Sequence, residues 1–401
     1  MRLVIIGAGF AGMYAALSAA RLREIRGVSP DEFEIALVAP EPTLVVRPRL
    51  YEKNPETLTA PLLDVLKAID VTYVQGSVET VETQSRMVKI ATTKGTRKTL
   101  SYDRVVAATG SRLFRPNIPG LAEHGFSVDS LDDAIALDRH LHGLARRPAV
   151  NGRDTIVVAG GGFTGIEAAT EMPARLRAIL GADAKTRVII VERNSAIAPD
   201  MGAGPRPVIE SALRKLGVET RLGAGVASLD ESGVTLSNGE HIETETVIWA
   251  AGIRAAPLTA QIPAERDNFG RLLVDRCLRV PGVEGVFATG DAARAACDDE
   301  GNYALMSCQH ATRMGAFAGN NAAAELLGVP TRPYHQKAYV TCLDLGEAGA
   351  LFTRGWDRKV EMVGDVAKKT KQEINTVWIY PPKAERAAAL ASADPERVTS
   401  L

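Results

Sequence analysis

Two parts of the chain repeat one pattern: a short and mostly apolar run, a turn rich in glycine, and a long alanine-rich segment. The apolar runs cover residues 3–6 and 155–159. A run of this length bounded by glycine is typical of a strand buried on both faces of a parallel sheet. Each copy therefore predicts a strand, a tight turn and a helix, which is how a βαβ unit begins.

Similar patterns continue along the chain. Further buried strands are predicted at apolar runs covering 35–38, 104–108, 188–191, 247–250 and 286–288. An alanine-rich stretch at about 307–327 predicts a long helix closed by Pro330, and two prolines in 115–120 predict a linker. Short strands at 338–345 and 349–353 lie beside a lysine-rich segment. The order predicts an α/β fold with a duplicated unit and a small α+β C-terminal domain.

Both turns carry the same glycine spacing. The first is Gly7-x-Gly9-x-x-Gly12 and the second is Gly160-x-Gly162-x-x-Gly165. Glycines at these places let the backbone bend tightly, approach a pyrophosphate and pack the helix on the sheet, so that the first helical amides face the phosphates. One such match is weak, but two in the same context predict that the chain binds two dinucleotides.

An acidic residue after the second strand of each unit indicates which nucleotide is bound. Glu192 follows Gly165 by 27 residues, an interval longer than the usual 20 or so, and is expected to bind a ribose. At the matching place the first unit has Ala39, so Glu41 is the candidate there. A carboxylate repels a 2′-phosphate, so Glu192 predicts NADH over NADPH. Arg193 beside it leaves the strictness of that preference open.

Composition limits the class of protein. The chain has 401 residues and a formal net charge of −1, which fits two or three domains and argues against a nucleic-acid partner. Because the first predicted strand begins at Leu3, we expect no signal peptide. No apolar run approaches the 18 or so residues of a membrane span. We expect a cytoplasmic protein. The six histidines are scattered and predict no metal site; they are His124, His140, His142, His241, His310 and His335.

With these pieces in order, the chain resembles the flavoproteins that have two dinucleotide-binding domains, and among them the type II NADH dehydrogenases, which are NADH:quinone oxidoreductases, and their soluble relatives. The motifs that carry the resemblance are residues 7–12, Ala108-Thr109-Gly110, residues 160–167, residues 249–252 and residues 288–291. The resemblance implies FAD at the first fingerprint and NADH at the second. It also implies that Asp291 binds the ribityl chain and that Glu167 lies near the contact between nicotinamide and flavin.

The candidate site residues follow from the motifs and the resemblance together. Those expected to act in catalysis are Glu167, Gln309 and Arg313. Those expected to bind FAD are Gly7, Gly9, Phe10, Ala11, Gly12, Glu41, Arg47, Val78, Ala108, Thr109, Gly110, Gly290, Asp291 and Gln309. Those expected to bind NADH are Gly160, Gly162, Phe163, Thr164, Gly165, Glu167, Glu192, Arg193, Ala251 and Gly252.

Three departures from the type II pattern concern the electron acceptor. In the quinone-site motif the second glutamine is replaced by Arg313, which is expected to share a helix face with Gln309 beside the flavin and to favour polar acceptors. The pair of amphipathic C-terminal helices is not apparent after Leu351. Arg49 and its neighbours also resemble a segment of ferredoxin reductases, so Arg47, Arg49 and Arg313 suggest a basic docking patch for a ferredoxin-like carrier.

The cysteines add a constraint by their positions. None of the four lies in the first 276 residues, where related disulfide reductases and peroxidases carry a redox-active cysteine. Electrons are therefore expected to pass from NADH to FAD and then directly to an external acceptor.

We expect an FAD-binding domain formed by 1–114 and 270–330, an NAD-binding domain at 115–269 and a C-terminal domain at 331–401. The expected activity is NADH oxidation with a quinone or similar diffusible acceptor. Two alternatives stay open: a reductase of a ferredoxin-like carrier, and an NADH-sensing flavoprotein similar to the apoptosis-inducing factors. Peripheral membrane contact, a homodimer and the role of the last 70 or so residues also stay open.

Overall fold

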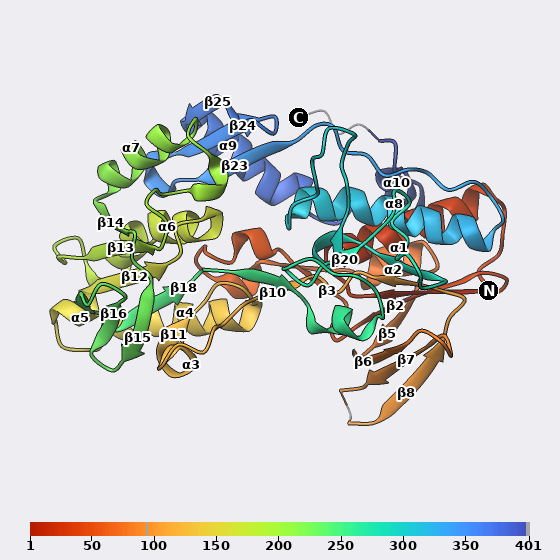
Figure 1. Cartoon of the computed structure of the whole chain (residues 1–401), viewed down its shortest axis with the longest axis horizontal. Helices are drawn as coiled ribbons and strands as arrows, with labels where there is room; N and C mark the ends of the chain where they lie inside the picture. The colour runs from red at the N-terminus through yellow and green to blue at the C-terminus, as the bar shows by residue number, and fades with distance from the viewer. Residues whose placement is uncertain (94, 398–401) are drawn as a thin grey trace.

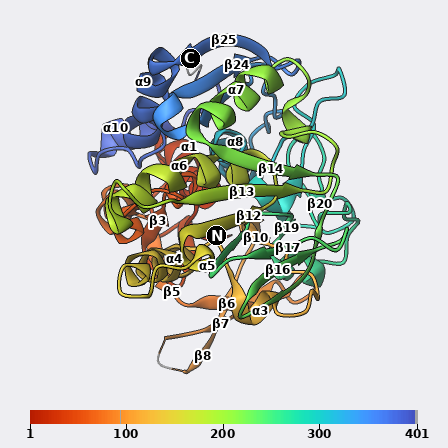
Figure 2. The same cartoon turned by 90° about the vertical axis from the view of Figure 1, so that its left-hand side faces the viewer.

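The computed structural model describes residues 1–93 and 95–397. Two parallel sheets form two lobes, and the C-terminal elements lie across the top of both (Figure 1). Each sheet is covered by helices, which gives both lobes the layered arrangement of an α/β fold. Turning the molecule shows α9, β24 and β25 next to α7 and above α6 (Figure 2).

The first sheet has five parallel strands in the order β21-β9-β1-β2-β5. The strands are β1 (Arg2–Ile6), β2 (Glu34–Ala39), β5 (Thr72–Gln75), β9 (Arg104–Ala107) and β21 (Val286–Ala288). Because strand β21 joins its neighbour β9 from a distant part of the sequence, this lobe is built from two separate stretches of chain. The apolar residues Leu3–Ile6 of β1 are buried on both faces of the sheet, as the sequence pattern predicts.

The second sheet repeats this plan in the order β11-β18-β12-β13-β14, again all parallel. Its strands are β11 (Gly125–Phe126), β12 (Thr155–Ala159), β13 (Arg187–Glu192), β14 (Val218–Leu222) and β18 (Thr246–Trp249). The two sheets confirm the predicted duplication of a nucleotide-binding unit. The carboxyl ends of β1 and β12 lead straight into the two glycine turns.

Helix α1 (Phe10–Ile25) packs closely on α8 (Cys308–Leu326). Two glycines of α8 make this possible, because a Cβ on Gly315 would lie 2.3 Å from the carbonyl oxygen of Ala11 and one on Gly319 would lie 2.0 Å from that of Ala15. Helix α8 begins where the sequence predicts, with the Ser307 hydroxyl accepting from the amide of His310 as an N-cap. The close packing brings the first turn of α8 beside the first glycine turn.

The other helices are α2 (Leu63–Ala68), α3 (Leu121–His124), α4 (Leu131–Leu144), α5 (Asn151–Asp154), α6 (Phe163–Leu180), α7 (Arg206–Leu216), α9 (Asp365–Glu373) and α10 (Arg386–Ser392). Single turns of 3₁₀-helix cover Arg47–Arg49, Pro55–Thr57, Pro199–Met201, Pro257–Gln261, Gly290–Ala292 and Gly346–Ala348. One π-helical turn, Ile374–Trp378, continues α9. Helices α9 and α10 lie after Leu351, where the pair of amphipathic helices of the type II enzymes is not apparent from the sequence.

Small sheets complete the lobes and connect them. Antiparallel sheets are formed by β3 (Thr43–Val45) with β4 (Thr59–Pro61), by β6 (Ser77–Glu82), β7 (Met87–Ala91) and β8 (Arg97–Ser101), and by β15 (Val226–Asp230), β16 (Gly233–Leu236) and β17 (His241–Glu243). Strands β20 (Leu272–Leu273) and β22 (Ala293–Arg294) pair in parallel. An antiparallel two-stranded ribbon, β10 (Ser111–Leu113) with β19 (Ile253–Ala255), joins the two lobes.

The C-terminal elements form a three-stranded antiparallel sheet with α9 packed on it. The strands are β23 (Val340–Asp344), β24 (Ala350–Arg354) and β25 (Lys359–Gly364). Strand β23 and the turn at Gly346–Ala348 contact α6 of the second lobe, while α10 contacts α1 of the first. This part of the chain therefore touches both lobes. Within the described residues, no helix is long and apolar enough to cross a membrane.

Candidate functional site

The first glycine turn has the shape of a dinucleotide cradle. Gly7 has φ of +111°, and a Cβ there would lie 2.4 Å from the carbonyl oxygen of Ala108. A Cβ on Gly12 would lie 1.8 Å from the carbonyl oxygen of Gly7. Around Gly9, however, a Cβ would meet nothing within 4 Å. Gly7 and Gly12 thus hold the turn closed, while the bare backbone at Gly9 is left open for a ligand.

The second turn repeats this geometry. Gly160 has φ of +118°, and a Cβ on Gly165 would lie 1.9 Å from the carbonyl oxygen of Gly160. Gly162, like Gly9, has open space around it, with only the Asp200 carboxylate at 3.9 Å. Each helix that follows begins with a phenylalanine and has no side-chain cap. Both helix N-termini therefore present unpaired amides, which suit a pyrophosphate.

Buried polar atoms without a hydrogen-bond partner gather near the first turn. They include Thr109 Oγ1, Thr289 Oγ1 and Gln309 Oε1, which come from the ends of β9 and β21 and from the first turn of α8. Buried polar groups are almost always hydrogen-bonded in folded proteins. Three orphan atoms at one sheet edge, next to an open glycine turn, fit a bound nucleotide with many polar groups, as FAD has.

Asp291 follows these strands and is nearly buried. Its carboxylate accepts from the Ser111 hydroxyl at 2.5 Å and lies 3.8 Å from Arg47. Burial raises the pKa of Asp291, while Ser111 and Arg47 act in the opposite direction. Arg47 also pairs with Asp129. Asp291 and Arg47 thus lie together where the lobes meet, and the donors of Arg47 contact protein groups.

The residues at the adenosine ends of the two sites differ. Glu192 is buried at the end of β13, and its carboxylate accepts from the Gly161 amide at 2.7 Å and from the Asn194 amide at 2.8 Å. Glu192 therefore supports the second glycine turn directly. Glu41 and Arg193 are exposed, and Val78 is half-buried in β6. Only Glu192 of these four is held by the turn that it is expected to serve.

Glu167 lies in the first turns of α6 and is buried in an ion pair. Its Oε1 accepts from Lys371 Nζ at 2.8 Å and from the Asp344 amide at 2.9 Å. Burial raises the pKa of Glu167 to about 7, although Lys371 lowers it. Lys371 also donates to the Cys342 carbonyl at 3.0 Å. The second lobe and the C-terminal elements thus share a buried proton-binding pair.

Further ionisable side chains surround this pair. Burial, with the charge of Asp344, also raises the pKa of Glu171 to about 7. The Tyr51 hydroxyl is buried without a hydrogen-bond partner. Burial raises the pKa of Tyr51, and the negative charge of Glu167 raises it further. The lysine-rich segment is not uniformly solvated, because Lys371 is buried and Lys368 pairs with Asp344 at 2.5 Å.

The structure separates Gln309 from Arg313. The side-chain oxygen of Gln309 is buried without a hydrogen-bond partner in the first turn of α8. Arg313 points to the C-terminal segment, where it donates to the carbonyl oxygens of His335 at 2.8 Å and Arg397 at 3.1 Å. Its guanidinium also lies over the ring of Phe317. These contacts do not support an effect of Arg313 on the flavin. They indicate that Arg313 helps to hold the segments at His335 and Arg397.

The basic docking patch suggested from the sequence is also not supported. Arg49 pairs with Glu52 at 2.7 Å and donates to the Tyr380 hydroxyl at 3.0 Å. Arg47 is paired with Asp129 and Asp291, and Arg313 is occupied as described. All three arginines are thus used inside the protein.

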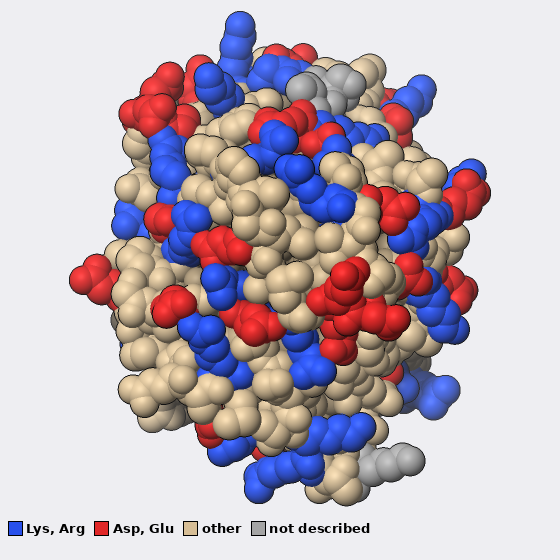
Figure 3. Space-filling view, turned by 90° about the vertical axis from the view of Figure 1, so that its right-hand side faces the viewer, with Lys and Arg blue, Asp and Glu red and all other residues tan. Residues whose placement is uncertain are grey.

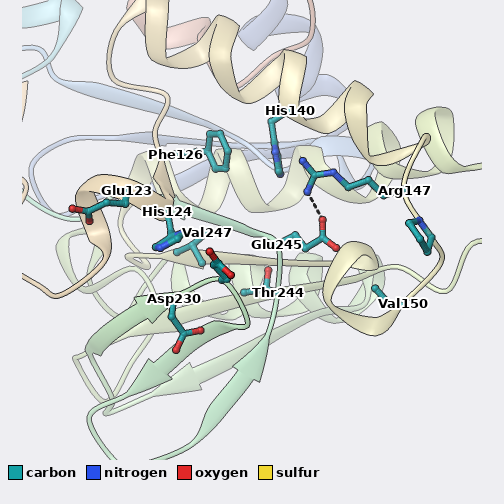
Figure 4. A pocket seen from close by; sticks show the side chains of 12 residues that line it. Glu123, His124, Phe126, His140, Arg147, Val150, Asp230, Thr244, Glu245 and Val247 are labelled. Carbon is teal, nitrogen blue, oxygen red and sulfur yellow. Dashed lines mark hydrogen bonds and ion pairs between the residues drawn. The ribbon is translucent and has the colours of Figure 1, made fainter.

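A pocket of about 560 Å³ lies away from the glycine turns (Figure 4). It is lined by the start of β18, by β11 and by α3 and α4, and Arg147 pairs with Glu245 across it. Since Val247 lies near the start of β18 and Ala250 follows its other end, the pocket and the second glycine turn lie at opposite ends of this strand. The pocket is therefore separate from the candidate nucleotide site.

The buried thiols are protonated at neutral pH. Burial raises the pKa of Cys308 and Cys297 to about 11 and that of Cys342 to about 12. Since the thiolate is the reactive form and well under about 1% of each thiol is deprotonated at pH 7.5, alkylation should be slow. We expect NADH oxidation to survive iodoacetamide, as measured by turnover after alkylation. Rapid loss of turnover that NADH prevents would place a reactive Cys308 at the acceptor site.

Comparison with known proteins agrees with this geometry. The family model described as pyridine nucleotide-disulphide oxidoreductase matches residues 1–315. A protein of Mycobacterium tuberculosis named NADH dehydrogenase-like is 46% identical over 397 residues, covering 98% of both chains. A demethylphylloquinone reductase of Synechocystis is 28% identical, covering 88% of this chain and 86% of its own.

Two solved structures share the fold. A structure of NDH2 from Plasmodium falciparum in complex with NADH has a TM-score of 0.79 at 14% identity, covering 98% of this chain and 97% of that one. The sulfide:quinone oxidoreductase of Aquifex aeolicus has a TM-score of 0.78 at 18% identity, covering 97% and 92%.

Proposed function

The chain belongs to the pyridine nucleotide-disulphide oxidoreductase family and is an NADH-dependent oxidoreductase that uses FAD. We propose that its electron acceptor is a quinone. The pair of matching glycine turns, one beside orphan polar atoms and the other beside Glu192, supports the two nucleotide sites that NADH oxidation through FAD needs. A quinone is favoured because relatives are named as quinone reductases. The absence of a cysteine before residue 277 removes the usual protein relay.

The reaction needs a proton as well as electrons. In the overall change, NADH, a proton and a quinone give NAD⁺ and a quinol, so one proton comes from solvent. When bound, FAD supplies the carrier that accepts a hydride and releases its electrons. Glu167, with a pKa near 7 and Lys371 at 2.8 Å, is suited to hold and release that proton at neutral pH.

The remaining site residues bind and orient. The open backbone at Gly9 and Gly162 admits the two pyrophosphates, and the helix amides behind them donate to the phosphates. Glu192 is placed to accept from the ribose hydroxyls of NADH. Asp291 and Gln309 face the first nucleotide. In this proposal NADH and FAD bind on either side of the junction between the lobes, where the two can meet.

The test is the acceptor profile of the purified protein. We expect yellow protein with FAD bound, and steady NADH oxidation when a soluble short-chain quinone is added. Bleaching of the flavin by NADH without turnover on any quinone would favour an NADH-sensing flavoprotein. Turnover only with a protein carrier would favour the ferredoxin-type reductase. Protein that neither contains nor takes up FAD would contradict the assignment of the first site.

Glu192→Ala is expected to raise KM for NADH and to narrow the preference over NADPH. The change removes the acceptor for the ribose hydroxyls, removes a charge that repels a 2′-phosphate, and frees the Gly161 amide. Loss of one charged hydrogen bond of about 1.5–3 kcal/mol corresponds to roughly a 10- to 150-fold rise in KM. Steady-state kinetics with both cofactors measure it, with Arg193→Ala as the neighbouring control. Equal kcat/KM for the two cofactors in the unmodified protein would contradict this role.

A further inference from the structure

Two arginines lie directly opposite each other on the ribbon that joins the lobes. Arg112 of β10 and Arg254 of β19 are cross-strand partners, and both are exposed. Within the described residues, Arg112 has no ion pair or hydrogen bond from its side chain, and Arg254 contacts only the ring of Phe114. Like charges directly opposite on a ribbon are destabilising. The fold thus keeps two uncompensated positive charges side by side.

Exposed aromatic rings extend from this pair. Phe114 is 41% exposed, Phe269 is 51% exposed and Tyr303 is 39% exposed. The Ala255 amide donates to the Phe269 carbonyl at 2.9 Å, and Arg271 donates to the Ala304 carbonyl at 2.8 Å, so the segments are neighbours. Arg294 lies 4.0 Å over the Tyr303 ring. We call this surface the arginine–aromatic patch; it consists of Arg112, Phe114, Arg254, Phe269, Arg294 and Tyr303.

The patch lies on the outer face of the β10–β19 ribbon, whose inner face is beside Asp291. Along β10, side chains alternate between the two faces. Ser111 points inward and donates to Asp291 at 2.5 Å, while Arg112 points outward. Tyr303 lies shortly before Ser307, where α8 begins with Gln309 in its first turn. In Figure 1, β10 lies in the middle of the molecule, between the lobes.

The patch differs from the charged surface drawn in Figure 3. On the face shown in Figure 3, side chains of both signs are interspersed. Two carboxylates of segments that adjoin the patch are paired with other arginines, Asp267 with Arg271 at 2.7 Å and Asp133 with Arg115 at 3.2 Å. Exposed arginine and aromatic residues are the types enriched at protein interfaces. The unpaired positive charges of Arg112 and Arg254 on this ribbon favour an acidic partner.

The arrangement of the rings decides between a protein and a lipid surface. Arg254 covers the face of Phe114 at 4.3 Å, and Arg294 covers Tyr303. A ring covered by a guanidinium is not free to enter a bilayer. A stacked guanidinium, however, is held with its N–H edge outward, which suits two-point binding of a carboxylate. We propose that the arginine–aromatic patch docks an acidic protein that carries single electrons away from the reduced enzyme.

This proposal rests on NADH oxidation as proposed above and adds a second kind of acceptor. One NADH and two oxidised carriers give NAD⁺, a proton and two reduced carriers, so charge and electrons balance. The carrier takes one electron at each docking, and the proton is released to solvent. Docking at the patch would bring a carrier's redox centre to the outer face of the β10–β19 ribbon. The inner face of this ribbon carries Ser111, which donates to Asp291.

Binding of an oxidised, acidic [2Fe–2S] ferredoxin to the holoprotein tests the patch. Calorimetry at about 0.01 M salt, where the Debye length is about 30 Å, should show binding that weakens as salt rises. The double variant Arg112→Ala/Arg254→Ala should bind at least about tenfold more weakly, a change of about 1.4 kcal/mol. The matched control is Arg139→Ala/Arg146→Ala, which removes two exposed arginines near the end of α4 and should bind within about twofold of the unmodified protein.

Two further measurements separate the possible failures. The melting temperature of the patch variant should be unchanged or higher, since a like-charge pair is removed. Quinone turnover and FAD content should be unchanged, and their loss would count against the proposed function rather than the patch. No ferredoxin binding by the unmodified protein at low salt, or equal binding by the two double variants, would overturn the proposal. So would binding to phosphatidylglycerol vesicles that the patch variant alone loses, because the patch would then be a lipid surface.

Discussion

Gly165→Ala is expected to raise KM for NADH roughly a hundredfold while FAD stays bound, and Gly12→Ala is expected to weaken FAD binding by a similar factor. A Cβ at these positions would lie 1.9 Å and 1.8 Å from a carbonyl oxygen of its own turn. Neither contact can be relieved by a rotamer change, because both atoms belong to the backbone. Strain of about 3 kcal/mol is ordinary for such overpacking and corresponds to roughly a hundredfold weaker binding.

The measurements are the flavin spectrum of the purified variants and the KM for NADH. Gly143→Ala is the matched control, because a Cβ there meets nothing within 4 Å and alanine favours helix α4. A Gly165→Ala protein with unchanged KM would show that the second turn does not bind NADH. A Gly12→Ala protein with a full content of FAD would contradict the assignment of the first turn.

The second large effect is expected at Lys371. Lys371→Met leaves the buried Glu167 carboxylate without its cation, and breaking a buried ion pair from one side costs about 3–5 kcal/mol. The melting temperature should therefore fall by several degrees, as measured by differential scanning fluorimetry. Lys369→Met is the control, since Lys369 is exposed on the same helix. A melting temperature equal to that of the control would show that the pair does not stabilise the fold.

The loss should depend on pH in a defined direction. Glu167 has a reference pKa of 4.5 and a folded value of about 7, so between these values the folded state binds more protons than the unfolded state. Its contribution to stability therefore falls as pH rises through that range. Without Lys371 the folded pKa rises further, and the penalty should be larger at pH 8 than at pH 5. The double variant Glu167→Gln/Lys371→Met should recover most of the loss at pH 8.

Several features followed from sequence because their causes are local. Short apolar runs followed by glycine at fixed spacing specify a strand, a turn and a helix within about ten residues. Gly7 and Gly12 contact each other's backbone five residues apart, so the cradle is encoded where it forms. Ser307 likewise caps α8 through an amide three residues on. The two nucleotide sites and the position of α8 could therefore be predicted.

Other features depended on contacts between distant parts of the chain. Lys371 meets Glu167 across 204 residues, and nothing in the lysine-rich segment shows that one lysine is buried while Lys369 is exposed. Arg313 shares a helix face with Gln309, yet its long side chain turns to carbonyls of residues 335 and 397. The unpaired Arg112 and Arg254 are opposite only because β10 and β19 form a ribbon.

The sequence by itself thus determined the two βαβ units, their glycine turns and the acid that favours NADH, since these depend on backbone geometry within a few residues. Only the tertiary structure decided which charges are buried, which are paired and which are left free. A charged side chain chooses its partner among groups brought near by folding, and the free energy of that choice depends on burial. The spacing of residues along the chain does not indicate which partner a charged side chain will have.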